Sequence, residues 1–190
     1  MKTLLCAAAL CAAALSANAA DTLPTLPDGT LITGTLSGAS TSLLGLDHEF
    51  AAEPGSNITA LSGTELEYIS GDFALAVDLM SDGGLLIYGN TDNGALPGNY
   101  VLSFSFAALP APLNSFALVD TSHVLSGSAS AQLLSANSIQ ITLNNVVLDS
   151  PFSTISAQAV STVPEPASWA LIAAGLGMFA SRAQRRGEQA

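Results

Sequence analysis

Between Thr3 and Ser181 the chain contains neither lysine nor arginine. All four basic residues lie at the extreme ends of the chain: Lys2, Arg182, Arg185 and Arg186. Most of the 15 acidic residues lie in the long interval between them, and the formal net charge is −11. In this interval only His48 and His123 can supply a cation for an ion pair. Folding must therefore rest on burial of apolar side chains and on backbone hydrogen bonds.

The acidic charge excludes nucleic acid as a partner. Phosphate backbones are recognised mainly through lysine and arginine, and the central part of the chain has none. An anionic polysaccharide would be repelled at low salt for the same reason. Divalent cations would relieve the repulsion among the carboxylates.

The N-terminal segment has the order of regions found in secretory signal peptides. Lys2 is followed by an apolar stretch over residues 4–15 and then by Ala17-Asn18-Ala19, small residues typical of a cleavage site. We therefore expect a signal peptide over residues 1–19, cut after Ala19. The alternative is a short buried helix.

The length of 190 residues fits one domain, which we place at residues 20–160. Both cysteines, Cys6 and Cys11, lie in the expected signal peptide. The mature protein would then have no thiol and no disulfide, and disulfides are permitted but not required outside the cytoplasm. Neither cysteine has the preceding residues expected of a lipoprotein signal.

Short alternating apolar patterns dominate the expected domain. The clearest begins at Phe73, where every second residue is apolar: Phe73, Leu75, Val77 and Leu79. This period of two predicts a half-buried strand. Residues 81–84, Ser-Asp-Gly-Gly, then favour a turn, and residues 85–88 can pair back as a hairpin.

Three further patterns of the same kind follow. The apolar positions are Tyr100, Leu102, Phe104 and Phe106, then Ile139, Ile141 and Leu143, and finally Ile155, Ala157 and Ala159. Val146 and Leu148 change parity after Asn144-Asn145, which predicts a bulge or tight turn. No window shows sustained helical periodicity, and turn residues are frequent. The sequence therefore predicts an all-β domain, an antiparallel β-sandwich or jelly roll.

The last thirty residues, 161–190, change in character. Pro164-Glu165-Pro166 precedes residues 167–181, which carry no charge and which we expect to form a single transmembrane helix. Such a helix would be about 22 Å long, against a hydrocarbon core of about 30 Å. Its large apolar residues are Trp169, Leu171, Ile172, Leu176, Met178 and Phe179. A span this short requires bilayer thinning or snorkelling of its flanks.

The residues at the two ends of the span predict its orientation. Trp169 suits a membrane interface, and Arg182, Arg185 and Arg186 favour the cytoplasmic side, so the domain would face outward. The alternative, a helix packed on the domain, is disfavoured because the segment is apolar all round.

This tail resembles the sorting signal of the PEP-CTERM proteins of exopolysaccharide-producing Gram-negative bacteria. The matching residues run from Val163 through Pro164-Glu165-Pro166 to Leu171, and again over Ala174–Gly177. The resemblance implies that Pro164, Glu165 and Pro166 are recognised by an exosortase, a membrane enzyme that processes the tail. It also implies export by the secretion machinery, transit through the inner membrane, and a final location at the cell surface or in the extracellular biofilm matrix.

Two groups of residues in the domain are candidates for catalysis. In Asp47-His48-Glu49 a carboxylate could orient the imidazole for base catalysis or metal binding, although a polar turn is the simpler interpretation. Glu65 and Glu67 would share one face of a strand about 7 Å apart, within the range for an inverting glycosidase. Any i, i+2 pair has this separation, and a solvated strand edge, with Leu66 and Tyr68 on the other face, is the simpler interpretation of this pair.

A calcium site is the remaining candidate. Asn90, Asp92, Asn93 and Gly94 resemble part of a calcium loop, but the bidentate glutamate of an EF-hand is missing near Val101. These residues also suit a plain turn. A different calcium site would use Asp78, Asp82 or Asp92. We assign no cofactor, no metal ligand and no catalytic residue.

These features predict a non-enzymatic structural, adhesive or glycan-contacting domain that is exported and sorted. One alternative is a secreted polysaccharide-acting hydrolase that uses Glu65 and Glu67. Another is a surface protein that stays anchored and is never processed.

Overall fold

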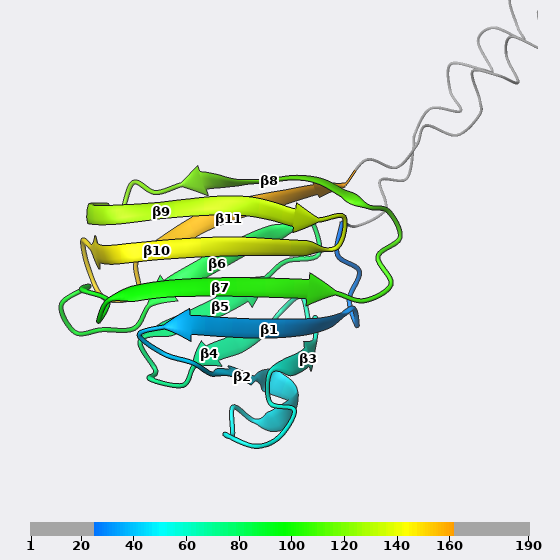
Figure 1. The fold of residues 1–190 in the computed structure, drawn as a ribbon, viewed down its shortest axis with the longest axis horizontal. Helices are drawn as coiled ribbons and strands as arrows, with labels where there is room; N and C mark the ends of the chain where they lie inside the picture. The colour runs from blue at the N-terminus through cyan, green and yellow to red at the C-terminus, as the bar shows by residue number, and fades with distance from the viewer. Residues whose placement is uncertain (1–24, 162–190) are drawn as a thin grey trace, which may run out of the picture. The chain divides into compact units, whose positions relative to one another are not determined.

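The computed structural model describes residues 25–161, which fold as two antiparallel β-sheets in two layers (Figure 1). The expected signal peptide at 1–19 lies outside the described residues. So does the expected membrane helix at 167–181. No helix within 25–161 has the length and apolar character needed to cross a membrane.

One layer is a five-stranded sheet with the order β3-β1-β7-β10-β9. Its strands are β1 (Leu31–Gly38), β3 (Ile58–Ala60), β7 (Asn99–Phe106), β9 (Val124–Ser135) and β10 (Ser138–Leu148). Every neighbouring pair is antiparallel.

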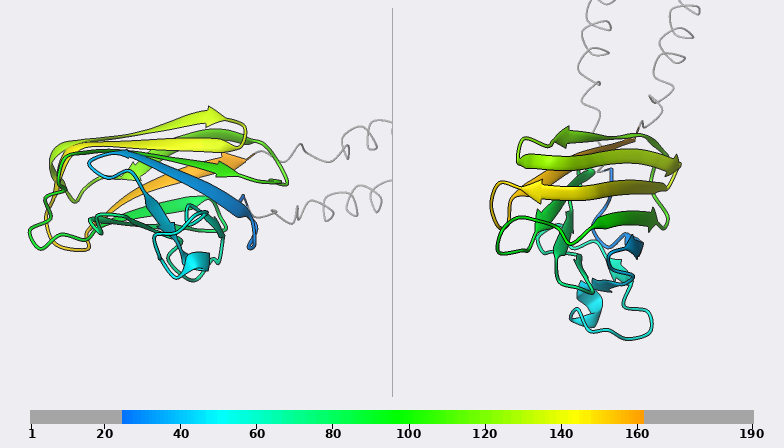
Figure 2. Two further views of the ribbon diagram at one scale, coloured as in Figure 1. Left: turned by 60° about the horizontal axis from the view of Figure 1, so that its bottom comes forward. Right: turned by 60° about the vertical axis from the view of Figure 1, so that its left-hand side comes forward.

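The other layer is a six-stranded sheet with the order β2-β4-β5-β6-β11-β8. Its strands are β2 (Leu43–Gly45), β4 (Tyr68–Ser70), β5 (Leu75–Leu79), β6 (Gly84–Gly89), β8 (Leu113–Asp120) and β11 (Thr154–Ser161). A short 3₁₀ helix, η2 (Leu46–His48), follows β2. Figure 2 shows the two sheets as separate layers, with η2 and its loop beside one edge.

The core lies between the sheets and is built from the alternating residues of both. On β7 the inward residues Tyr100, Leu102, Phe104 and Phe106 are at most 1% exposed. The Tyr68 ring of the opposite sheet packs against Phe104, with ring centroids 5.6 Å apart. Side chains on alternate positions of an antiparallel strand reach one face, so a period of two suffices to fill this layer. The predicted antiparallel sandwich is confirmed.

The predicted change of parity in β10 is also confirmed. The pairing of β10 with β9 shifts register between Asn144 and Val147, and Asn145 has a φ of 46°. This irregularity turns Val146 inward, where it is fully buried. Gly127 of β9 lies opposite, and a Cβ there would come within 2.3 Å of the carbonyl oxygen of Asn145.

The predicted hairpin forms from β5 and β6, in which Val77 pairs with Ile87. The prediction for Phe73, however, is wrong. This residue lies in the turn before β5 with a φ of 59°, and 57% of it is exposed. The alternating pattern includes Phe73, but the strand begins only at Leu75, after a turn closed by the amide of Phe73 donating to the carbonyl of Ser70.

Candidate functional site

The residues predicted to direct export and sorting all lie outside the described residues. They are Ala17, Ala19, Pro164, Glu165, Pro166, Trp169, Leu171, Ile172, Leu176, Met178, Phe179, Arg182, Arg185 and Arg186. The candidate polar residues that the structure does describe belong to the strands of the sandwich and to the loops between them.

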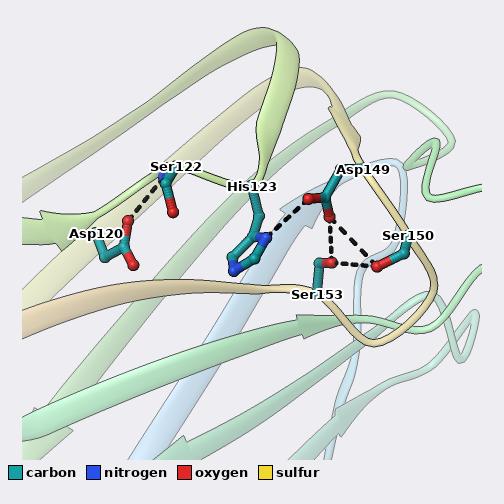
Figure 3. A network of polar contacts seen from close by, with 6 residues as sticks. All are labelled: Asp120, Ser122, His123, Asp149, Ser150 and Ser153. Atoms are coloured by element: carbon teal, nitrogen blue, oxygen red, sulfur yellow. Dashed lines mark hydrogen bonds and ion pairs between the residues drawn. The ribbon is translucent and has the colours of Figure 1, made fainter.

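One cluster of polar side chains joins two loops that connect the sheets (Figure 3). His123 ends the loop between β8 and β9, and Asp149 begins the turn between β10 and β11. The Nδ1 atom of His123 lies 2.9 Å from Oδ2 of Asp149. The backbone amide of Asp149 also donates to the carbonyl of His123 at 3.0 Å. The two loops are therefore held together by both side chains and backbone.

Asp149 also organises its own turn. The hydroxyls of Ser153 and Ser150 both donate to Oδ1 of Asp149, and the two hydroxyl oxygens lie 2.7 Å apart. On the other loop, Asp120 accepts the amide of Ser122 at 2.8 Å. These are side-chain-to-backbone and short-range contacts of the kind that fix turns.

In this cluster His123 and Asp149 each favour the charged form of the other. Hydrogen bonds from Ser153 and His123 lower the pKa of Asp149 to about 2. The hydrogen bond to Asp149 raises the pKa of His123 above its usual value, with a smaller contribution from the charge of Asp120. The histidine cation therefore persists to a higher pH than that of a free imidazole.

Serine, histidine and aspartate occur together here, but not in the order of a nucleophilic triad. In a triad the serine hydroxyl bonds the imidazole, and the carboxylate bonds the other ring nitrogen. Here Ser150 and Ser153 bond the carboxylate instead, and within residues 25–161 no hydrogen bond joins a serine hydroxyl to His123. The arrangement orders two loops and does not activate a hydroxyl.

A second aspartate organises another turn in the same way. Oδ1 of Asp72 accepts the hydroxyl of Ser70 at 2.6 Å and the amide of Ala74 at 3.2 Å. Its Oδ2 accepts the hydroxyl of Tyr100 at 2.6 Å. Partial burial raises the pKa of Asp72, but the bonds from Ser70, Tyr100 and Ala74 outweigh it and leave the pKa below its usual value. Because Tyr100 belongs to β7, this bond links the β4–β5 turn to the opposite sheet.

The Asp47-His48-Glu49 triplet is a turn and not an assembled site. His48 pairs with Glu53, its Nδ1 atom 2.6 Å from Oε1 of Glu53, and bonds neither neighbour. Asp47 accepts the backbone amide of Ala60 at 2.8 Å, and Glu49 has a φ of 52° at the end of η2. The simpler interpretation of this triplet, a polar turn, is confirmed.

The predicted strand edge with Glu65 and Glu67 on one face is wrong. Both residues precede β4, and Glu67 is fully buried whereas Glu65 is exposed. Glu67 accepts the amide of Leu79 at 2.7 Å and that of Ser62 at 3.1 Å. Burial raises the pKa of Glu67, and these two bonds oppose that rise. The side chain satisfies backbone donors, and no counter-ion for it occurs among residues 25–161.

The calcium candidates likewise serve turns. Asp82 accepts the amide of Gly84 at 2.8 Å, and Asn93 accepts the amide of Ala95 at 3.0 Å. The amide of Gly94 donates to the carbonyl of Thr91, which closes the turn. Across residues 25–161 no group of three or more His, Cys, Asp or Glu side chains is placed to hold a metal ion.

Sequence reasoning did not find the contact between His123 and Asp149. The two residues are 26 positions apart, and they meet only because two loops that join the sheets lie side by side. The sequence does contain a local signal for the turn, because Asp149-Ser150-Pro151 is rich in turn-forming residues. No local signal identifies its partner loop.

Comparison with known proteins identifies one region of the chain. The PEP-CTERM protein-sorting motif matches residues 162–186. No curated protein and no solved structure gives a significant match. The motif marks the chain as an exported protein that is processed by an exosortase and sorted to the cell envelope.

Proposed function

We propose that the sandwich is a non-enzymatic structural or adhesive component of the surface or extracellular matrix of a Gram-negative bacterium, with exopolysaccharide as its partner. In this proposal the signal peptide is removed after Ala19, the secretion machinery exports the chain, and the tail holds it in the inner membrane only in transit. An exosortase then processes the tail near Pro164-Glu165-Pro166. The sorting motif supports the delivery part of the proposal.

The observation that carries the adhesive role is the charge distribution over the five-stranded sheet. None of its five strands contains a charged residue, although the protein is strongly acidic. Its outward positions on the long strands are occupied mostly by hydroxyl and amide side chains: Thr33, Thr35, Ser37, Ser103, Ser105, Ser128, Ser130, Gln132, Gln140 and Thr142.

Such a face suits broad contact with a polyol. Hydroxyl and amide groups both donate and accept hydrogen bonds, as sugar hydroxyls do. In the register of the sheet Thr35, Ser103, Gln140 and Gln132 form one row across four strands. Adjacent strands lie about 4.8 Å apart, so the row presents closely spaced polar groups on one surface. Because none of these strands carries a charged side chain, contact between this face and a polyol buries no fixed charge.

The hydrolase alternative receives less support from the site geometry. A glycosidase needs two carboxyl groups on either side of the scissile bond. Glu67 is buried and occupied by two backbone amides, so only Glu65 of the suggested pair is accessible. If the purified protein releases reducing ends from matrix polysaccharide, and Glu65→Gln abolishes that release, the non-enzymatic assignment is wrong.

The delivery part is tested by intact mass of the native product. The protein is recovered from envelope and medium fractions of strains with and without the exosortase. We expect the chain to begin at residue 20 in both strains. We expect it to lack residues 182–190 only in the strain that has the exosortase. A variant with Pro164, Glu165 and Pro166 replaced by alanine should keep its tail in both strains. If the tail is retained on the wild-type product, the permanently anchored alternative replaces sorting by cleavage.

A further inference from the structure

The phenylalanines of the described region divide into two groups of three. Phe104, Phe106 and Phe116 are buried in the core. The other three, Phe50, Phe73 and Phe152, all adopt a positive φ, with values of 58°, 59° and 62°. Phe73 is 57% exposed and Phe152 is 66% exposed. A large residue in this conformation is strained, and glycine or asparagine adopts it at lower cost.

Two of these phenylalanines lie at the same end of the six-stranded sheet. Phe73 is two residues before β5 and Phe152 is two residues before β11, and both strands pair with β6. The amide of Phe152 donates to the carbonyl of Gly89 at 2.7 Å, and Nδ2 of Asn90 donates to the carbonyl of Phe73 at 2.8 Å. Because one strand separates them, their backbones lie about 10 Å apart.

A third aromatic residue lies on β6, the strand between them, opposite positions that are two residues after Phe152 and three residues after Phe73. Tyr88 of β6 is half-buried and pairs with Ala76 on one side and Thr154 on the other. Its chain neighbours Ile87 and Gly89 are buried, so alternation places Tyr88 on the outer face of the sheet. Phe73, Tyr88 and Phe152, which we call the aromatic row, thus belong to three neighbouring segments.

The turns that carry the two phenylalanines are each fixed by an aspartate. Asp72 accepts hydrogen bonds from Ser70, Ala74 and Tyr100 around Phe73. Asp149 is bonded by Ser150, Ser153 and His123 around Phe152 (Figure 3). A turn fixed in this way loses little backbone conformational entropy when a ligand binds.

The fold gains nothing evident from these two residues. Their side chains are largely exposed, and their backbone conformation favours a smaller residue. The adjoining loop contains a second unfavourable feature. Oγ1 of Thr91 is buried without a hydrogen-bond partner, and it alone has this property among the side-chain nitrogen and oxygen atoms of the described residues. Backbone strain at exposed residues, held in place by the surrounding hydrogen bonds, is often found at binding surfaces.

The charges and the area of the aromatic row select its occupant. The domain is acidic and carries Asp72 and Asp149 beside the row, so an anionic lipid surface or an anionic polysaccharide would be repelled. A stable protein interface buries about 800 Å² on each partner, far more than a few aromatic side chains offer. A neutral chain with apolar faces and many hydroxyl groups matches both the rings and the surrounding polar groups.

We propose that the aromatic row is a binding site for an uncharged polysaccharide, whose sugar rings lie against Phe73 and Phe152. This inference rests on the proposed matrix function and locates a specific glycan contact within it. The carboxylates of Asp72 and Asp149 and the amide of Asn90 lie beside the row and can bond sugar hydroxyls.

The test is native affinity electrophoresis of the product purified from its own cells. Gels contain dextran, mixed-linkage β-glucan or galactomannan as neutral probes, and alginate as an anionic probe. The variants are Phe73→Asn, Phe152→Asn and the double variant. Phe50→Asn is the matched control, because Phe50 has the same positive φ but follows η2. We expect at least one neutral probe to slow the wild type and Phe50→Asn, the single variants to be slowed less, and the double variant not at all.

Thermal unfolding of the same variants separates a binding role from a structural one. Asparagine relieves the positive-φ strain, so the variants should unfold at the same temperature as the wild type or higher. The inference is overturned if no neutral probe slows the wild type, if alginate slows it more, or if the double variant still binds or unfolds earlier. If one of these outcomes is found but the double variant is still processed and recovered with the matrix, only the glycan site is refuted and the proposed function is retained. Absence of the wild type from the matrix fraction instead overturns the proposed function.

Discussion

The hydroxyl of Tyr100 donates to Oδ2 of Asp72 at 2.6 Å and so joins the five-stranded sheet to a turn of the six-stranded sheet. The ring of Tyr100 is fully buried, whereas Asp72 reaches the surface. The domain has no lysine or arginine to neutralise Asp72, and neutral donors take that role. A tyrosine hydroxyl, a serine hydroxyl and a backbone amide together hold the carboxylate.

Replacing Tyr100 by phenylalanine should lower the free energy of unfolding by about 1 kcal/mol, the usual contribution of one such hydrogen bond. Chemical denaturation measures this change. Tyr88→Phe is the matched control and should have little effect, because no hydrogen bond of the Tyr88 hydroxyl occurs among the described residues. Equal losses in the two variants would mean that the bond to Asp72 contributes nothing.

The same pair predicts a pH dependence. The pKa of Asp72 lies below its ordinary value of 3.8 in the folded protein. Its stabilising contribution is therefore fully present above pH 3.8 and is lost as the pH falls through the lower folded pKa. The difference in stability between wild type and Tyr100→Phe should be constant near neutrality and should shrink below about pH 4. A difference that grows on acidification would contradict this assignment.

The contact of His123 with Asp149 should be visible in the titration of the histidine. The carboxylate raises the pKa of His123, so Asp149→Asn should lower it toward 6.5, as followed by NMR of the imidazole protons. Ser150→Ala is the control, because this serine contacts Asp149 and not the ring. If the pKa of His123 is unchanged in Asp149→Asn, the ion pair does not form in solution.

This ion pair also has a defined pH window. The contribution of His123, whose pKa is raised, is present below 6.5 and is lost as the pH rises through its folded pKa. That of Asp149, whose pKa is lowered to about 2, is present above 3.8 and is lost as the pH falls through 2. Both contributions are complete between pH 3.8 and 6.5. The stability difference between wild type and Asp149→Asn should be largest there.

Strands that pack on one face could be predicted from the sequence, because successive side chains of a strand point to opposite faces of the sheet and only one face is buried. The pattern of β7 and the parity change of β10 both appear in the burial of Leu102 and Val146. Strand β9 could not be found in this way. Its twelve residues are mostly serine, alanine and glycine, and its place is set by backbone pairing with β10.

The errors at Phe73 and Glu67 have a different cause. Phe73 fits the alternation, but Asp72 closes a turn at that point through contacts with Ser70 and Ala74. Glu67 has the composition of a surface residue, but it meets a backbone amide of Leu79, twelve residues away. The order of apolar and polar residues near Glu67 does not indicate which distant backbone amide will need a hydrogen-bond acceptor. The sorting tail could be identified from sequence because its signal is linear.

Glu67 provides a direct test of a buried carboxylate without a cation. Glu67→Ala leaves the amides of Leu79 and Ser62 without their acceptor in a buried place. Each unsatisfied donor costs about 1–3 kcal/mol, so the two amides predict a loss of about 2–6 kcal/mol in unfolding free energy. Glu65→Ala, two residues earlier and exposed, should change stability by less than about 0.5 kcal/mol. Similar values for the two variants would show that Glu67 is solvated.

The raised pKa of Glu67 has the opposite pH dependence to Asp72. A carboxyl group whose folded pKa exceeds its ordinary value of 4.5 stabilises the fold below that value, and this contribution is lost as the pH rises through the folded pKa. The stability advantage of wild type over Glu67→Ala should therefore be larger in mild acid than at neutrality. An advantage that increases with pH would mean that the two amide bonds outweigh burial.

The placement of basic residues makes the boundaries of the mature protein testable with one protease. Trypsin cuts after lysine or arginine, and none occurs from Thr3 to Ser181. A product that has lost both the signal peptide and the residues from Arg182 onward should remain intact in trypsin even when unfolded in urea. A glutamate-specific protease is the control and should fragment the same unfolded sample, since Glu49, Glu53 and Glu65 are then accessible.

Comparing the two proteases on the unfolded sample distinguishes resistance to trypsin caused by the fold from resistance caused by the absence of lysine and arginine. A folded anchored chain would resist trypsin in its sandwich but would lose its terminal residues at Arg182, Arg185 or Arg186, with a mass decrease that is visible by intact mass. A fully processed chain would show no mass change at all. A tryptic decrease on the product from the medium would therefore place the processing site after Arg182 and contradict cleavage near Pro164-Glu165-Pro166.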